Sequence, residues 1–123
     1  MRPLYSETIS VAVLEEADKA AMFELYDRYY AATDRARFEA DLSKKTFVIL
    51  IRNELKVVVG FSTLSVHRQS VEKEEIDYIF SGDTILDASR WGNPTLLRAW
   101  FRTAGALKRQ LGAQRLYWFP IVK

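Results

Sequence analysis

The sequence predicts a single α/β (α+β) domain over residues 1–123, with a central, mostly antiparallel mixed sheet of about five strands and helices on both faces. Two observations support this fold class. Apolar, β-branched segments alternate with amphipathic helical segments in the order strand, helix, helix, three strands, helix, strand. In addition, 49% of the 123 residues are hydrophobic, which is enough for one domain to bury a sizeable core.

The first predicted elements are a strand over residues 9–14 and a helix from about residue 16 to residue 31. The strand segment is β-branched, with apolar residues at alternating positions. The helix has one apolar face, because large side chains recur at helical spacings. They are Met22, Leu25, Tyr26, Tyr29 and Tyr30. Core packing is the favoured role of the three tyrosines, and lining an acceptor pocket is the alternative.

A second, shorter helix is predicted before the sheet continues. Thr33 or Asp34 can cap its first turn, because a short polar side chain accepts hydrogen bonds from the unpaired amides there. Phe38 and Leu42 form an apolar pair four residues apart, and the polar residues 43–45 end the pattern.

Three consecutive strands are predicted to form an antiparallel meander. Residues 47–51 are apolar throughout, as expected of a strand that is covered on both faces. Residues 53 and 54 make a turn into a strand over residues 56–66. A polar loop is expected over residues 67–75, and the next strand over residues 76–87.

The third of these strands is expected to contain a bulge at Gly82. Ile76, Tyr78 and Phe80 occupy alternate positions before the glycine, whereas Ile85 lies on the opposite parity after it. One extra residue at Gly82 explains this switch, and a bulge there would bend the strand and release backbone groups from the ladder.

A long amphipathic helix over residues 94–111 and a last aromatic strand over residues 115–122 complete the predicted fold. Gly112 follows the helix as its stop signal. The inner stripe of the helix is expected to consist of Leu97, Trp100, Phe101, Ala104, Leu107 and Leu111.

Charge and composition narrow the function classes. Eighteen basic and sixteen acidic residues leave a net charge of +2 without a long block of one sign, so no nucleic-acid partner is expected. The absence of cysteine and the single histidine argue against a disulfide framework and against a metal site. No signal peptide or apolar run of membrane-spanning length is seen, so we expect a soluble, cytoplasmic protein without a membrane partner.

The segment over residues 79–97 carries the strongest functional signal. An apolar strand leads into a turn that contains Gly92, and the long helix follows directly. A helix start presents unpaired N–H groups and a partial positive charge, so this arrangement favours a bound phosphate or pyrophosphate.

The element order, the bulge and this turn together resemble the GNAT superfamily of acyl-CoA N-acyltransferases, over nearly the whole chain. The residues Gly-Phe-Ser-Thr-Leu at positions 60–64 look like the third strand of that family, and residues 85–94 sit where it carries its cofactor loop. The resemblance implies acetyl-CoA or another acyl-CoA as cofactor and an amine, of unknown identity, as acceptor. It implies no metal.

The resemblance also implies site residues. In the family, the pantetheine arm runs along the strand beside the bulge and the pyrophosphate rests on amides of the turn. Carried over by position, the pantetheine would face Ile85 and Leu86, and the pyrophosphate would be held by Arg90, Trp91, Gly92, Asn93, Thr95 and Leu96. Asp83 is the candidate general base, because a carboxylate beside a bulge can accept the amine proton. The alternative for Asp83 is a local hydrogen bond within the turn.

Several positions depart from the family pattern. Ser89 stands at the usual Arg/Gln position and Pro94 at the second Gly/Ala position. Asn93 followed by proline is a good helix cap, so the helix can satisfy its own first amides. The family also continues beyond its fifth strand, whereas this chain ends at Lys123. The alternative function is therefore a non-catalytic GNAT-like module that forms a homodimer or binds a partner through its last strand.

Overall fold

The protein is represented by a computed structural model that describes residues 4–30, 32–87, 93–111 and 116–120. Its elements in chain order are β1 (Tyr5–Ser10), the short 3-10 helix η1 (Val11–Val13), α1 (Glu16–Tyr29), α2 (Arg35–Ser43), β2 (Phe47–Arg52), β3 (Val58–Val71), β4 (Glu74–Leu86), α3 (Thr95–Leu111) and β5 (Leu116–Pro120). The described strands form one sheet in the order β1-β2-β3-β4-β5. Neighbours are antiparallel except for the parallel pair β4 and β5.

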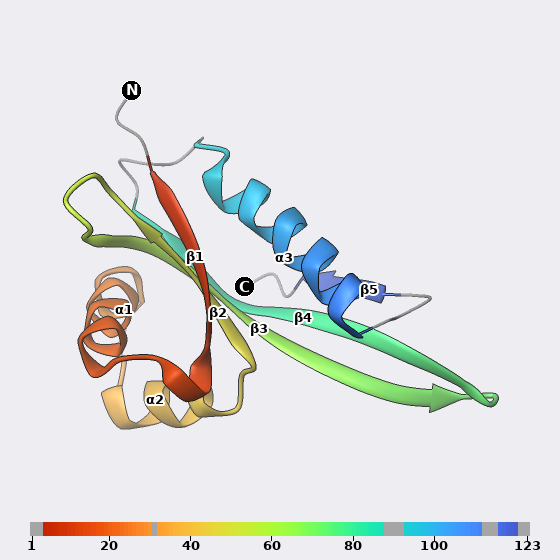
Figure 1. Ribbon diagram of the computed structural model, residues 1–123. Coiled ribbons are helices and arrows are strands. Elements are labelled where there is room, and N and C mark those ends of the chain that lie inside the picture. Colours follow the sequence, from red (N-terminus) through yellow and green to blue (C-terminus); the bar gives the residue numbers. More distant parts are fainter. Residues whose placement is uncertain (1–3, 31, 88–92, 112–115, 121–123) are drawn as a thin grey trace.

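Helices cover both faces of this sheet (Figure 1). We call the side that packs against α1 and α2 the α1/α2 face, and the opposite side the α3 face. Each face has its own cluster of buried apolar side chains. The predicted fold class, a mostly antiparallel mixed sheet of five strands between helices, is confirmed.

Strand β2 links the two clusters because its side chains are buried on both faces. Val48 and Leu50 belong to the cluster under α1 and α2, whereas Ile49 and Ile51 belong to the cluster under α3. All four are fully inaccessible to solvent. The unbroken apolar run that predicted a strand covered on both faces is explained by this position, since neither face of β2 meets water.

The helices α1 and α2 pack through aromatic side chains. Phe38 of α2 contacts Tyr26 of α1, with ring centroids 5.0 Å apart, and meets Phe61 of β3 edge-on at 6.1 Å. The predicted cap is also present, because Asp34 Oδ1 accepts hydrogen bonds from the amides of Ala36 (2.9 Å) and Arg37 (3.4 Å). Helix α1 ends at Tyr29, two residues before the expected position.

The first strand differs from its prediction. Strand β1 covers Tyr5–Ser10 rather than residues 9–14, and residues 11–13 form η1 instead. The reason is the register with β2, which runs from Tyr5 opposite Arg52 to Ser10 opposite Phe47. Because β2 begins at Phe47, the chain beyond Ser10 has no strand to pair with, and it turns toward α1.

The predicted polar loop over residues 67–75 is also wrong. Strands β3 and β4 continue through it as one long hairpin that extends beyond the helices (Figure 1). Only Glu72 and Lys73 form the turn, and both have positive φ angles (50° and 71°), as a tight two-residue hairpin turn requires. His67 and Arg68 are exposed because no helix covers them, so their polarity marks a solvated strand and not a loop.

Helix α3 buries only part of the predicted stripe. Leu107 is buried and Trp100 and Ala104 pack against the core, but Leu97 and Phe101 are exposed (52% and 70%) and Ala99 is buried in addition. Thr103 is buried as well, and its hydroxyl hydrogen-bonds that of Thr8 on β1 at 2.9 Å. The hydrophobic pattern missed Ala99 and Thr103 because one is small and the other is polar. The side chain of Leu111 and those of β5 lie outside the described residues.

A partly buried ion pair links the two strands of the projecting hairpin. Asp77 of β4 is 3% exposed and accepts hydrogen bonds from Nε (2.7 Å) and Nη2 (3.1 Å) of Arg68 on β3. These hydrogen bonds keep the pKa of Asp77 below its usual value; burial opposes this effect, and the positive charge of Arg68 adds to it. In the described part of the chain, no helix has the length and apolar composition needed to cross a membrane.

This pair predicts how stability depends on pH. Since the pKa of Asp77 is lowered on folding, its contribution is fully present above the unfolded value of about 3.9 and is lost as pH falls through the folded value. Asp77→Asn should therefore lower the free energy of unfolding at neutral pH by about 1 kcal/mol, because Arg68 is half-exposed. The difference should shrink in acid. Urea unfolding between pH 7 and pH 3 measures it.

The matched control is Glu24→Gln, which removes an exposed ion pair with Arg28 on α1 (3.9 Å). This variant should stay close to the wild type at every pH, because exposed pairs contribute little. A constant difference between Asp77→Asn and the wild type from pH 7 to pH 3 would contradict the role given to Asp77.

Candidate functional site

The candidate site begins at a bulge in β4. In the β3–β4 ladder, Ser62 lies opposite Thr84 and Leu64 lies opposite Ser81. The two residues Gly82 and Asp83 therefore share one opposite residue, Thr63. The bulge predicted at Gly82 is present, and it has the two-against-one count that increases local twist and bends the strand.

The described part of the β4–β5 ladder ends beside this bulge. This parallel ladder runs from Asp77 opposite Leu116 to Ser81 opposite Pro120. From Gly82 to Ile85, no strand pairs with the outer edge of β4 among the described residues. An extended ligand can complete such an edge by hydrogen-bonding its backbone, as an added strand would.

The side chains of Ile85 and Leu86 are not free to line this edge. Ile85 is 6% exposed and belongs to the core of the α1/α2 face. Leu86 packs against the cluster of the α3 face, and its Cδ1 would lie 2.7 Å from a Cβ at Gly60. A ligand along β4 would therefore meet the backbone groups of these two residues, and their side chains would hold the strand in place.

The start of α3 is described only in part. Of the residues implied as pyrophosphate contacts, Arg90, Trp91 and Gly92 lie outside the described residues. The remaining three are Asn93, Thr95 and Leu96. Asn93 Oδ1 accepts hydrogen bonds from the amide of Thr95 (2.9 Å) and from its hydroxyl (2.6 Å). The helix thus caps itself at one of the amides that an anion would use.

The remaining candidates are Asp83 on β4 and three tyrosines at the end of α1, and the single histidine of the chain lies on β3. The backbone of Asp83 lies in the bulge, and its side chain is outside the described residues. His67 lies on the exposed hairpin, where it stacks on Tyr78 (centroids 5.2 Å apart) and meets Phe80 edge-on (5.8 Å). Tyr29 donates a hydrogen bond to Asp87 Oδ1 at 2.9 Å, just beyond the end of β4. Tyr26 and Tyr30 pack against the core.

A chain of hydrogen bonds supports the bulge on the α3 face. Trp100 Nε1 donates to Ser62 Oγ (3.1 Å), which is 2.9 Å from Thr84 Oγ1. Thr84 Oγ1 in turn donates to the carbonyl of Gly82 (3.2 Å). The chain ties α3, β3 and the bulge together. Sequence analysis does not predict this chain of hydrogen bonds, because Trp100 fits an apolar stripe and the hydroxyl residues form no recognisable pattern.

The α1/α2 face of the bulge is different. Thr63 is 2% exposed, and its hydroxyl has no hydrogen-bond partner. The half-buried side chain of Lys45, which follows α2, ends over Gly82. A Cβ at Gly82 would lie 2.5 Å from Thr63 Oγ1 and 3.1 Å from Lys45 Nζ. Sequence analysis missed both residues, since Lys45 appeared only as part of a helix end.

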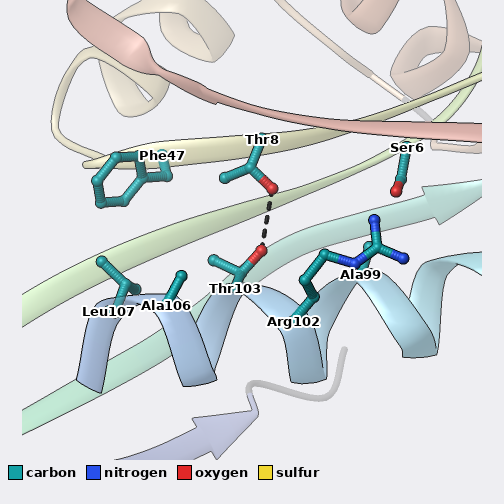
Figure 2. Close-up of a pocket in the computed structure, with 8 residues that line it drawn as sticks. All are labelled: Ser6, Thr8, Phe47, Ala99, Arg102, Thr103, Ala106 and Leu107. Atoms are coloured by element: carbon teal, nitrogen blue, oxygen red, sulfur yellow. Dashed lines mark hydrogen bonds between the residues drawn. The ribbon is translucent and has the colours of Figure 1, made fainter. Parts of the chain in front are cut away.

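A separate cavity of about 320 Å³ lies between α3 and the β1 edge (Figure 2). It is crossed by the hydrogen bond between Thr8 and Thr103. Its lining consists of Ser6, Thr8, Phe47, Ala99, Arg102, Thr103, Ala106 and Leu107. None of these residues belongs to the bulge. Among the described residues, no cluster of three or more acidic or histidine side chains could hold a metal ion.

Comparison with known proteins finds similarity in structure but not in sequence. No protein-family model and no curated protein matches the sequence. Several solved structures of acetyltransferases match its fold. An aminoglycoside acetyltransferase from an uncultured soil metagenomic sample, in complex with trehalose, has a TM-score of 0.64 at 17% identity, over 98% of this chain and 78% of the other.

Two further structures agree. The aminoglycoside N-acetyltransferase AAC(6')-Iy in complex with CoA has a TM-score of 0.65 at 8% identity, over 97% of this chain and 78% of its own. A GNAT family acetyltransferase from Staphylococcus aureus has a TM-score of 0.60 at 13% identity, over 97% of this chain and 87% of its own. The chain has the GNAT fold. At these identities the likeness establishes the arrangement of elements, and activity needs its own argument.

The two faces of the GNAT-fold bulge predict opposite effects of removing a hydroxyl. Thr63→Val should leave the free energy of unfolding unchanged or raise it by up to about 1 kcal/mol, because it removes a buried hydroxyl that has no partner. Ser62→Ala should lower it by about 1–3 kcal/mol, because it leaves the indole N–H of Trp100 without its acceptor. Chemical unfolding of both variants beside the wild type makes the comparison. A larger loss for Thr63→Val than for Ser62→Ala would contradict it.

Proposed function

We propose that this GNAT-fold chain binds acetyl-CoA or another acyl-CoA along the open edge of β4 and transfers the acyl group to an amine. The observation that carries the proposal is the bulge at Gly82, which bends β4 directly after the ladder that is described between β4 and β5. An extended thioester arm needs a strand edge to pair with, and from Asp77 to Ser81 both edges of β4 are already paired.

The reaction needs positioning more than it needs a reactive side chain. The amine nitrogen attacks the thioester carbonyl carbon, a C–N bond forms, the C–S bond breaks, and the thiolate leaves as CoA. The amine gives up one proton and the thiolate takes one. Backbone N–H groups released by the bulge can donate to the carbonyl oxygen as negative charge develops on it. Asp83 remains the candidate to accept the amine proton, and no covalent nucleophile is required.

The start of α3 would contribute less to binding the CoA pyrophosphate than the N-terminus of a helix without a side-chain cap. Asn93 already occupies the Thr95 amide, so a pyrophosphate there must compete with a side-chain cap. Arg90 is the residue in the turn that can add charge-assisted hydrogen bonds to phosphate oxygens. Affinity for CoA in this proposal therefore depends on the edge of β4 and on Arg90 more than on the helix dipole.

Thermal unfolding with CoA and with acetyl-CoA tests the binding. A ligand that binds only the folded chain stabilises it by about 2.7 kcal/mol at one hundred times its Kd, so we expect the melting temperature to rise by several degrees. Arg90→Ala should reduce the rise. Arg98→Ala is the matched control, because Arg98 is an exposed residue of α3, and it should leave the rise unchanged. No rise at 1 mM of either compound would contradict the proposal.

Transfer is measured separately, by release of free CoA thiol with a panel of amines. Turnover above the rate without enzyme supports the proposed reaction, and Asp83→Asn should lower kcat by about 10²-fold or more if Asp83 is the base. A chain that ignores CoA but elutes as a dimer would instead favour the non-catalytic alternative. In that case, association through residues 116–122 becomes the function to test.

A further inference from the structure

Lys45 is held so that its ammonium group reaches the bulge. Its backbone is fixed where α2 ends and β2 begins, because the Lys45 amide donates to the carbonyl of Leu42 (2.9 Å) and the Thr46 amide donates to that of Leu64 (2.8 Å). From this anchored base the side chain extends over β4. Its Nζ and Cε would lie 3.1 Å and 3.3 Å from a Cβ at Gly82.

Only glycine at position 82 leaves room for this arrangement. A Cβ there would approach Thr63 Oγ1 to 2.5 Å, a distance that real side chains do not tolerate. The Thr63 hydroxyl and the Lys45 ammonium therefore lie against the same side of the Gly82 backbone. We call this group of three residues the Gly82 cradle.

Both polar groups of the cradle have unused hydrogen-bonding capacity. Lys45 makes no ion pair with a carboxylate among the described residues, and the Thr63 hydroxyl has no partner while only 2% of the residue is exposed. Glu39, which borders a cavity together with Lys45, pairs with Arg35 instead (3.6 Å). A buried polar atom without a partner is rare in folded proteins and calls for an explanation, which a bound polar group would supply.

We propose that Lys45, Thr63 and the bare backbone of Gly82 bind a carboxylate at the reacting end of the substrates, so that the chain acts on an acidic molecule. The inference rests on the transferase function proposed above and names its substrate class. One ammonium group offers one positive charge and three donors, and the hydroxyl adds one donor, which together suit a single carboxylate. The partly buried position strengthens the attraction, because water screens it less.

The carboxylate can come from either of two sources. An acidic amine, such as an amino acid, would place it on the acceptor. A dicarboxylic acyl group, such as succinyl, would place it on the thioester. Both sources present the same chemistry to Lys45, so separate arms of the experiment must distinguish them.

Direct binding is tested first, without any thioester. The full chain is titrated with succinate and with succinamide, its uncharged analogue, while the NMR signal of the Gly82 amide is followed. The wild type should bind succinate and not succinamide. Lys45→Met should weaken succinate binding by about 10-fold or more, since it removes the charged donor, and Thr63→Val by about threefold. The matched control is Lys44→Met, a neighbouring exposed lysine, which should change nothing.

Acyl-transfer assays then show whether the carboxylate belongs to the acceptor amine or to the acyl group. One arm offers acetyl-CoA with aspartate or with its neutral relative asparagine, and the other offers succinyl-CoA or acetyl-CoA with one neutral amine. A carboxylate on the acceptor gives a preference in the first arm, and one on the acyl group gives it in the second. In either case Lys45→Met should abolish the preference, whereas Lys44→Met should keep it.

The outcomes distinguish this inference from the proposed function. Equal binding of succinate and succinamide, or equal losses in Lys45→Met and Lys44→Met, overturns the carboxylate site even if CoA binds. Acetyl transfer that ignores the charge of both substrates also overturns it and leaves the transferase intact. Succinate binding that depends on Lys45, in a chain that does not respond to CoA, overturns the transferase and supports the site.

Discussion

The structure depends on one backbone constraint, the placing of Gly82 and Asp83 against the single residue Thr63. Side chains of a strand alternate between faces, so one extra residue reverses every position that follows. Ile79 packs under α3, and without the bulge Ile85 would do the same. It packs instead in the core under α1 and α2. Because of the bulge, the same strand supplies apolar side chains to both cores.

The features of the fold that could be predicted from the sequence are those determined by residues close together in the chain. The parity switch at Gly82, the cap at Asp34 and the two-sided burial of β2 all follow from local patterns. The errors arise where tertiary contacts decide. Strand β1 ends where β2 begins, which no local pattern records. The polar hairpin was taken for a loop because solvated strands and loops have similar composition.

The candidate site shows the same division. A strand, a turn and a helix start were recognisable, and so was the bulge, because each has a local signature. Lys45 and Thr63 come from different elements and meet only because the sheet register brings β2, β3 and β4 together. Helix α3 gives a second example, since Thr103 was invisible to a hydrophobic pattern although it pairs with Thr8 on β1.

The two faces of the bulge are supported unequally, and this difference bears on function. On the α3 face, the hydrogen bonds from Trp100 to Ser62 and from Thr84 to the Gly82 carbonyl fix the backbone geometry. On the α1/α2 face, a hydroxyl and an ammonium group are left without partners among the described residues. Local rules of folding are most often broken where a protein binds something. The bulge is held rigid on one face and has unpaired polar groups on the other, so it can bind a ligand without rearranging. The free-energy cost of fixing its geometry is met during folding and does not reduce the affinity for the ligand.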